Sequence, residues 1–164
     1  MSIAWRDAMS IGDESIDDDH KRLIARINTF EQAVADGIDH KTVARVLLAL
    51  ADETAAHFTR EEELQKAIRY PYYESHRRSH REFLAKLQEI AGAYAVSVPG
   101  AARDGIVNNL SAFLKDLLVE HLIQSDLRMK PYVLQLKRSQ AEAIRKRRQA
   151  IALSEKMAGM EVAG

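Results

Sequence analysis

Apolar residues recur at helical spacing along four stretches of the chain, and no stretch shows the alternation of a strand. The four stretches cover about residues 17–36, 41–69, 73–96 and 101–130. Residue types that end helices separate them, namely Gly37, Tyr70-Pro71, Ser97-Val98-Pro99-Gly100 and Pro131. We expect the first helix to be capped by Asp17 to Asp19 and to stop at Gly37.

Helices of similar length joined by short loops pack as antiparallel neighbours. The pattern therefore predicts an all-α fold, an up-down-up-down four-helix bundle formed by residues 1–131. A chain of 164 residues and 18.5 kDa has the size of one ordinary domain. The low counts of 7 glycines and 3 prolines argue against collagen-like or low-complexity character.

The segment after the bundle, residues 132–164, differs from it in charge. It contains seven Lys or Arg and three Asp or Glu, so its net charge is +4 and that of residues 1–131 is −4. Apolar residues at loose helical spacing predict a fifth helix that is basic and weakly amphipathic. Such a helix is either solvated or packed on the bundle, or it docks on an acidic protein partner.

Composition limits both the chemistry and the partners. The 24 basic and 24 acidic residues cancel, so net charge gives no reason to expect binding to nucleic acid or a membrane. The absence of cysteine excludes disulfides, zinc thiolate sites, iron–sulfur clusters and thiol catalysis, so any metal must bind imidazole and carboxylate. Residues 1–7 lack the pattern of a secretory signal, and no 18 consecutive residues are apolar, so we expect a cytoplasmic protein.

Five of the six histidines occupy positions where a bundle normally has Leu or Ile. They are His20, His57, His76, His80 and His121. Burying an unpaired imidazole or carboxylate costs on the order of a few kcal/mol, whereas a whole domain is stable by about 5–15 kcal/mol. These histidines and Glu61 must therefore bond to one another, to water or to a metal. A buried polar network without metal is the alternative, but many partly satisfied groups destabilise a core.

The register of the antiparallel hairpins indicates whether these side chains meet, because facing residues keep a constant sum of residue numbers. The loop that follows the first helix gives a sum of 77, which places His20 opposite His57. The second turn gives a sum near 142, which places Glu61 beside His80. Side chains from the first three helices are therefore expected to meet.

The third turn gives a sum near 197 and places His76 opposite His121. Within the helices, His57 and Glu61 are four residues apart, as are His76 and His80. Residues at this spacing project from one face and can hold one metal or bridge two. All six groups are thus expected within about two helical turns, roughly 11 Å of bundle height.

Asp126 is the natural carboxylate to accompany His121 on the fourth helix. A spacing of five residues puts the two about 140° apart on an ideal α-helix. A wide inner face, or a loosening of the helix near its end at Pro131, would bring them together. Glu62 and Glu63 point away from the inner face in an ideal helix, so we expect both to be exposed.

Short motifs support the same site. They are Trp5, Ile11-Gly12, Ile16-Asp17, His20-Lys21 and Asn28; His57-Phe58-Thr59-Arg60-Glu61-Glu62; Tyr70-Pro71 with His76-x-x-x-His80; and His121-Leu122-Ile123-Gln124-Ser125-Asp126. From about residue 5 to residue 131 these motifs resemble the hemerythrin family, specifically its prokaryotic members, the bacteriohemerythrins. The family relative myohemerythrin is a known example of the up-down-up-down bundle.

The resemblance implies a centre of two non-haem iron ions. Its metal ligands would be His20, His57, Glu61, His76, His80, His121 and Asp126. The three histidines of the third and fourth helices would bind one iron and the other two histidines the second iron. Both carboxylates and an oxo or hydroxo group would bridge the ions. The second iron then has one donor fewer, which leaves a position where O2 would bind.

Two positions depart from the family pattern. Relatives are expected to have a methionine near position 65 and an aromatic residue near 117, where this chain has Gln65 and Leu117. Gln65 lies one turn beyond Glu61, and we expect it to be able to hydrogen-bond an iron-bound ligand. Leu64 and Leu117 either line the pocket or belong to the ordinary core. His40 is expected to be solvated and not a ligand.

Three functions remain open at this point. The first is reversible O2 binding for carriage, storage or sensing, without substrate turnover. The second is a di-iron oxidoreductase that acts on peroxide or nitric oxide. The third is an oxygen-responsive module that signals to a protein partner through residues 132–164. Enzyme-type bundles use carboxylate-rich Glu-x-x-His sites, whereas this set is rich in histidine, so we favour binding over catalysis.

Overall fold

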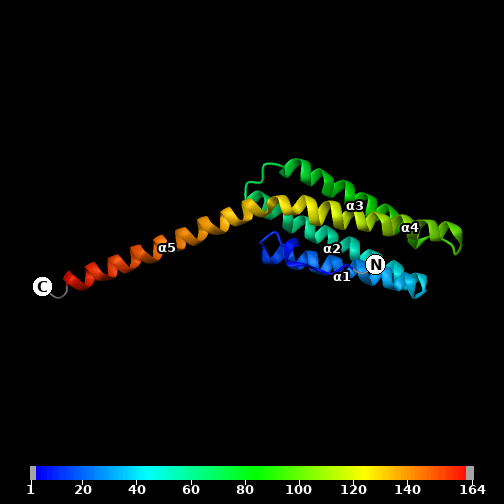
Figure 1. Cartoon of the computed structure of the whole chain (residues 1–164), viewed down its shortest axis with the longest axis horizontal. Helices are drawn as coiled ribbons and strands as arrows, with labels where there is room; N and C mark the ends of the chain where they lie inside the picture. The colour runs from blue at the N-terminus through cyan, green and yellow to red at the C-terminus, as the bar shows by residue number, and fades with distance from the viewer. Residues whose placement is uncertain (1–2, 162–164) are drawn as a thin grey trace.

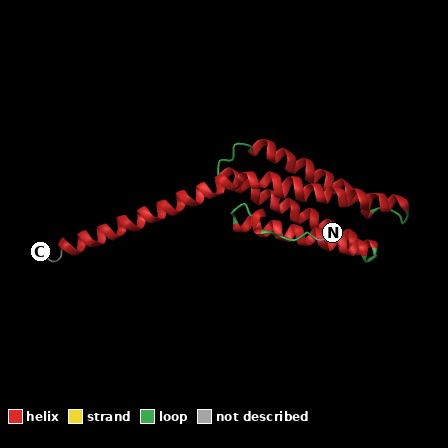
Figure 2. Ribbon diagram, viewed as in Figure 1, coloured by secondary structure: helices red, strands yellow, loops and turns green. Residues whose placement is uncertain are grey.

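The computed structural model describes residues 3–161, without the side chains of 101–102, 118–120, 155–156 and 158–161. In chain order the elements are η1 (Asp7–Met9), α1 (Glu14–Ala35), α2 (His40–Ala67), α3 (Tyr73–Ala95), α4 (Ala101–Asp116), η2 (Leu117–Ser125), η3 (Asp126–Met129) and α5 (Lys130–Glu161). Short loops join the helices, and this part of the chain has no strand (Figure 2). The prediction of an all-α four-helix bundle is confirmed.

The first helix begins earlier than predicted. Asp13 caps α1, and its carboxylate accepts hydrogen bonds from two backbone N–H groups of the first turn at 3.1 and 3.2 Å. The prediction that Asp17 to Asp19 cap this helix is wrong, because all three lie inside it. Asp17 instead accepts a hydrogen bond from the N–H of Ile11 at 2.9 Å and so ties the incoming chain to α1. Gly37 ends the helix with a φ of 65°, the left-handed conformation expected there.

Two apolar clusters fill the bundle, and the predicted ligands lie between them. The larger cluster includes Leu23, Leu47, Leu87 and Leu114. The smaller one consists of Ile11, Ile16, Ile68, Tyr70, Met129 and Val133. In α1, for example, the chain passes from Ile16 in the smaller cluster through His20 to Leu23 in the larger one. Apolar side chains therefore shield the polar groups from water along the bundle axis in both directions.

The fourth helix changes its winding where it reaches the predicted ligands. After α4 the chain forms the π-helix η2 and then the 3₁₀-helix η3, with backbone angles at their boundaries that stay in the right-handed helical region. The predicted end of the fourth helix near Lys130 is confirmed, since η3 ends at Met129 and α5 begins at Lys130. No loop separates them, because Pro131 lies in the first turn of α5, where its missing N–H has no helical partner to lose. The chain therefore runs on from the bundle into α5 (Figure 1).

Helix α5 leaves the bundle and projects from one end of it (Figure 1). Its first turn is anchored, since Val133 is buried and the Lys130 ammonium donates a hydrogen bond to the carbonyl of Ser10 at 2.8 Å. Residues 137–154 are all exposed. The division of the chain at residue 131 stays a prediction, and residues 162–164 of the predicted extension lie outside the described residues.

Among the helices described, none has both the length and the apolar composition needed to cross a bilayer. The cytoplasmic location stays a prediction from the sequence.

Candidate metal centre

Five helical elements, α1, α2, α3, η2 and η3, place seven polar side chains in one buried cluster at a common height of the bundle. These are the seven predicted ligands, His20, His57, Glu61, His76, His80, His121 and Asp126, and none is more than 5% exposed. They form two groups whose ligand atoms lie within 4.8 Å of one another: Glu61, His76, His80 and His121 in one, and His20, His57 and Asp126 in the other. The structure thus brings together every residue that the sequence predicted as a ligand.

Glu61 lies against histidines of both groups. Its Oε1 is 2.9 Å from Nε2 of His76, and its Oε2 is 3.3 Å from Nε2 of His80. The same Oε2 is 3.4 Å from Nε2 of His57, which belongs to the other group. A carboxylate in this position is placed to bind two metal ions at once.

Asp126 is shared in the same way. Its Oδ1 is 3.2 Å from Nε2 of His76 and 3.7 Å from Nε2 of His121. Its Oδ2 is 3.3 Å from Nε2 of His20, on the opposite side of the cluster. Two carboxylates therefore connect a group of three histidines to a group of two.

The atoms at the centre of this cluster have no hydrogen-bond partners among the described residues. They are Nε2 of all five histidines, Oε2 of Glu61 and both carboxylate oxygens of Asp126. Leaving so many buried polar atoms unpaired is costly, and they converge on a common space instead of pointing apart. Imidazole nitrogen and carboxylate oxygen are suitable donors for non-haem iron, so the residues fit a pair of iron ions.

The charges of the cluster also favour cations. Burial raises the pKa of Glu61, but its contacts with His76 and His80 outweigh burial and lower that pKa to about 2. The pKa of Asp126 is held well below its ordinary value, because nearby histidines, His121 foremost, outweigh its burial. Burial lowers the pKa of His121 to about 4, whereas the two carboxylates overcome burial at His76 and raise its pKa to about 10. Two ionised carboxylates thus lie within one buried cluster, where they attract cations.

The π-helix η2 explains how His121 and Asp126 reach the same space. The backbone N–H of Asp126 donates a hydrogen bond to the carbonyl of His121, five residues earlier. This i to i+5 bond is the defining contact of a π-helix, and it stacks residues that an α-helix would separate by about 140°. The sequence left open a wide inner face or a loosening of the helix near its end, and the structure has the loosening, over residues 117–125.

Further side chains contact the histidines at Nδ1, the ring nitrogen that faces away from the cluster. These contacts were not predicted from the sequence. Oδ2 of Asp19 lies 3.7 Å from Nδ1 of His57, and Nε of Arg60 donates a hydrogen bond to the same oxygen at 2.6 Å. Burial raises the pKa of Asp19, but His57 and Arg60 together lower it far below its ordinary value. The hydroxyl of Ser125 lies 3.3 Å from Nδ1 of His76. Partners of this kind fix the ring orientation and tautomer of a metal-binding histidine.

Glu62 also contacts the outer nitrogen of a clustered histidine, and the prediction that it is exposed is wrong. Its side chain is 20% exposed, with Oε1 3.1 Å from Nδ1 of His80 and Oε2 3.3 Å from Nε of Arg77. Glu63 is exposed as predicted. The second hairpin has a sum of 142, which pairs residue 62 with residue 80. The register alone could therefore have predicted the contact between Glu62 and His80.

The other residues discussed in the sequence analysis are not among the seven candidate metal ligands. Gln65 is fully buried, and its amide nitrogen donates a hydrogen bond to Oε1 of Glu61 at 2.7 Å. Leu117 is buried in the larger apolar cluster, and Leu64 packs against the smaller one. His40 is half-buried and not solvated as predicted, because its Nε2 lies 2.7 Å from the carbonyl oxygen of Tyr94.

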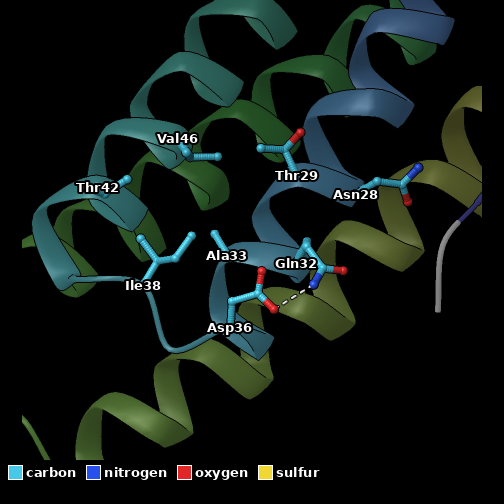
Figure 3. A pocket seen from close by; sticks show the side chains of 8 residues that line it. All are labelled: Asn28, Thr29, Gln32, Ala33, Asp36, Ile38, Thr42 and Val46. Atoms are coloured by element: carbon cyan, nitrogen blue, oxygen red, sulfur yellow. Dashed lines mark hydrogen bonds between the residues drawn. The ribbon is translucent and has the colours of Figure 1, made fainter.

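A surface pocket of the bundle lies away from this cluster. It is formed by the end of α1, the start of α2 and the loop between them (Figure 3). Its lining residues are Asn28, Thr29, Gln32, Ala33, Asp36, Ile38, Thr42 and Val46, and none of the seven clustered side chains is among them. The candidate site is therefore the buried cluster and not this open pocket.

Several known proteins are similar to this chain over most of its length. Residues 11–133 match the family model described as hemerythrin HHE cation binding domain. A bacteriohemerythrin of Pseudomonas paraeruginosa is 28% identical over 94% of this chain and 95% of its own length. A bacteriohemerythrin of Stenotrophomonas maltophilia is 28% identical over 76% of each chain. A myohemerythrin of Sipunculus nudus is 28% identical over 77% of this chain and 89% of its own length.

Proposed function

Because this chain belongs to the hemerythrin family, we propose that it binds O2 reversibly at two non-haem iron ions held by the seven clustered side chains. Its relatives, named bacteriohemerythrin and myohemerythrin, point to non-haem iron and O2 binding as the general function. The ligand assignment, an oxo or hydroxo bridge, and a role in carriage, storage or sensing are parts of this proposal.

The observation on which the proposal depends is the unequal division of the histidines. Three imidazoles lie in one group and two in the other, while Glu61 and Asp126 contact both groups. Two metal ions held in this way have unequal numbers of protein donors. The side with two histidines, His20 and His57, is therefore the side with room for a small ligand.

The iron pair would supply the electrons and the free coordination position that O2 needs. The surrounding chain keeps other molecules out, because every ligand is buried and apolar clusters lie on both sides along the bundle. Phe58 stacks on the ring of His80 with centroids 3.9 Å apart and also makes a T-shaped contact with the ring of His121. Such packing limits water and proton access and holds the rings in place.

Binding is favoured over turnover of peroxide or nitric oxide. The matching family model and the relatives named above are hemerythrins. The site is also rich in histidine, with Glu61 and Asp126 as its carboxylates, unlike the carboxylate-rich di-iron bundles.

The experiment that tests this function is repeated oxygenation of the iron-loaded, reduced protein. Absorption spectra recorded during addition and removal of air should interconvert over several cycles. Steady consumption of peroxide or nitric oxide with a reductant, without a stable oxygenated spectrum, would support the enzyme instead.

A second candidate function is oxygen sensing with α5 as the output. The observation that favours it is continuity, because the segment with His121 and Asp126 runs directly into α5, whose residues 137–154 are exposed. Its basic side chains, among them Arg138, Arg145 and Arg148, suit an acidic protein surface. Hydrogen exchange should then differ between deoxygenated and oxygenated protein across residues 117–136. Identical exchange in the two states would contradict this role.

A further inference from the structure

Gln65 is a polar residue with no place in the ligand set and no contact with water. It lies on α2 one turn after Glu61, with 0% of its surface exposed. Its Nε2 is 2.7 Å from Oε1 of Glu61, and its own Oε1 has no partner among the described residues. An apolar side chain would fill this position without burying an unpaired amide oxygen. The contact with Glu61 is therefore the feature that distinguishes a glutamine here.

The direction of this hydrogen bond follows from the two atoms that meet. The amide nitrogen of Gln65 lies 2.7 Å from Oε1 of Glu61, and a carboxylate that binds metal is deprotonated and can only accept. The reverse orientation would point the amide oxygen of Gln65 at a carboxylate oxygen, two acceptors with no proton between them. Gln65 is thus a donor to a candidate bridging ligand.

This bond also distinguishes the two oxygens of Glu61. Oε1 is held by Gln65 and lies 2.9 Å from Nε2 of His76, in the group of three histidines. Oε2 is left to face His57 and His80, one from each group. Gln65 therefore fixes the rotation of the carboxylate in the orientation that faces both groups.

We propose that Gln65 is a positioning residue for the metal pair, which holds Glu61 in its bridging orientation and weakens the electron donation of that carboxylate. This inference rests on the proposed function. A hydrogen bond donated to a ligand withdraws electron density from the metal, and ligand partners of this kind tune metal affinity and reduction potential. The bond from Gln65 thus favours the reduced iron pair, the form that takes up O2.

Gln65→Met tests the inference in the iron-loaded full-length chain, because methionine keeps the length of the side chain and removes the donor. The midpoint potential should fall, and a chelator should remove iron about tenfold faster, the lower end of the range for lost partners of metal ligands. Gln88→Met, at an exposed position of α3, is the matched control and should change neither quantity.

Gln65→Glu is a second variant that keeps the shape of the side chain, in case the methionine disturbs the fold. It replaces the donor with a second carboxylate beside Glu61, so the midpoint potential should fall again. If the wild-type protein fails to take up two irons or to oxygenate reversibly, the proposed function fails. If the wild type does both and the variants keep its potential and iron release, only the role of Gln65 is overturned.

Discussion

Glu62 places Oε1 3.1 Å from Nδ1 of His80, while the adjacent Glu61 faces Nε2 of the same ring at 3.3 Å. Consecutive residues of α2 therefore contact opposite nitrogens of one imidazole. Arg77 contacts the second oxygen of Glu62 at 3.3 Å and keeps this carboxylate in position. An imidazole held from both sides has a fixed tautomer, with Nε2 directed toward the cluster.

Glu62→Gln should weaken metal binding without removing a ligand. The amide cannot replace the charge of the carboxylate behind His80, so metal affinity should fall by about 10- to 100-fold. Glu63→Gln is the matched control, since this neighbour is exposed. Iron release to a chelator from both variants and the wild type measures the effect. Equal release rates in all three proteins would show that Glu62 plays no part in holding the metal.

Asp19→Asn should lower stability in a manner that depends on pH. The pKa of Asp19 is below its ordinary value of 3.8 in the folded protein, so the ionised group stabilises the fold above that value and loses this contribution as the pH falls. At neutral pH the substitution should cost about 1–3 kcal/mol, because it leaves charged partners without their carboxylate. Thermal unfolding of wild type and variant measures the difference.

This difference should shrink below about pH 4, where the unfolded carboxyl group becomes protonated. Asp18→Asn removes only the exposed ion pair with Lys21 and should have little effect at any pH. An Asp19 variant whose deficit stays constant down to pH 2 would show that its charge does not stabilise the fold.

The π-helical segment predicts how iron binding depends on the number of residues between His121 and Asp126. Removing Ile123 reduces the spacing of His121 and Asp126 to four residues, which an ordinary α-helix places on one face, so two irons should still bind. Inserting an alanine after Ile123 increases the spacing to six and should turn Asp126 away from the cluster. Iron content and circular dichroism distinguish the two variants. Equal iron content in both would mean that the π-helix does not position the ligands.

Metal binding should stabilise the folded chain. An ion that binds only the folded state at 100 times its dissociation constant adds about 2.7 kcal/mol per site, so iron should raise the unfolding temperature and a chelator should reverse the rise. His121→Leu should lose much of this increase, because it removes a donor from the group of three histidines. His40→Gln, a histidine outside the cluster, should keep all of it. An increase of equal size in both variants would contradict the assignment.

The sequence predicted the bundle and the meeting of the ligands because antiparallel helices with short loops obey a fixed register. Pairing His20 with His57 and His76 with His121 needed only the positions of the turns. The register could also have found Glu62, since it lies opposite His80, but an ideal helical wheel directed that side chain outward. The burial of a side chain depends on the neighbouring helix as well as on the direction in which the side chain points from its own helix.

Other features depend on tertiary contacts that a single sequence does not display. Asp13 and Asp17 are both good caps in isolation, but Asp13 caps α1 while Asp17 accepts the N–H of Ile11. Pro131 was expected to mark the end of a helix, but the sequence did not show that a 3₁₀ segment leads into the next helix without a loop.

The proposal that seven side chains bind two iron ions per chain is tested by the iron content of the purified, reconstituted full-length protein. We expect two irons per chain, with loss of iron when Glu61 or Asp126 is replaced by alanine. One iron per chain, or two irons that survive both replacements, would contradict it.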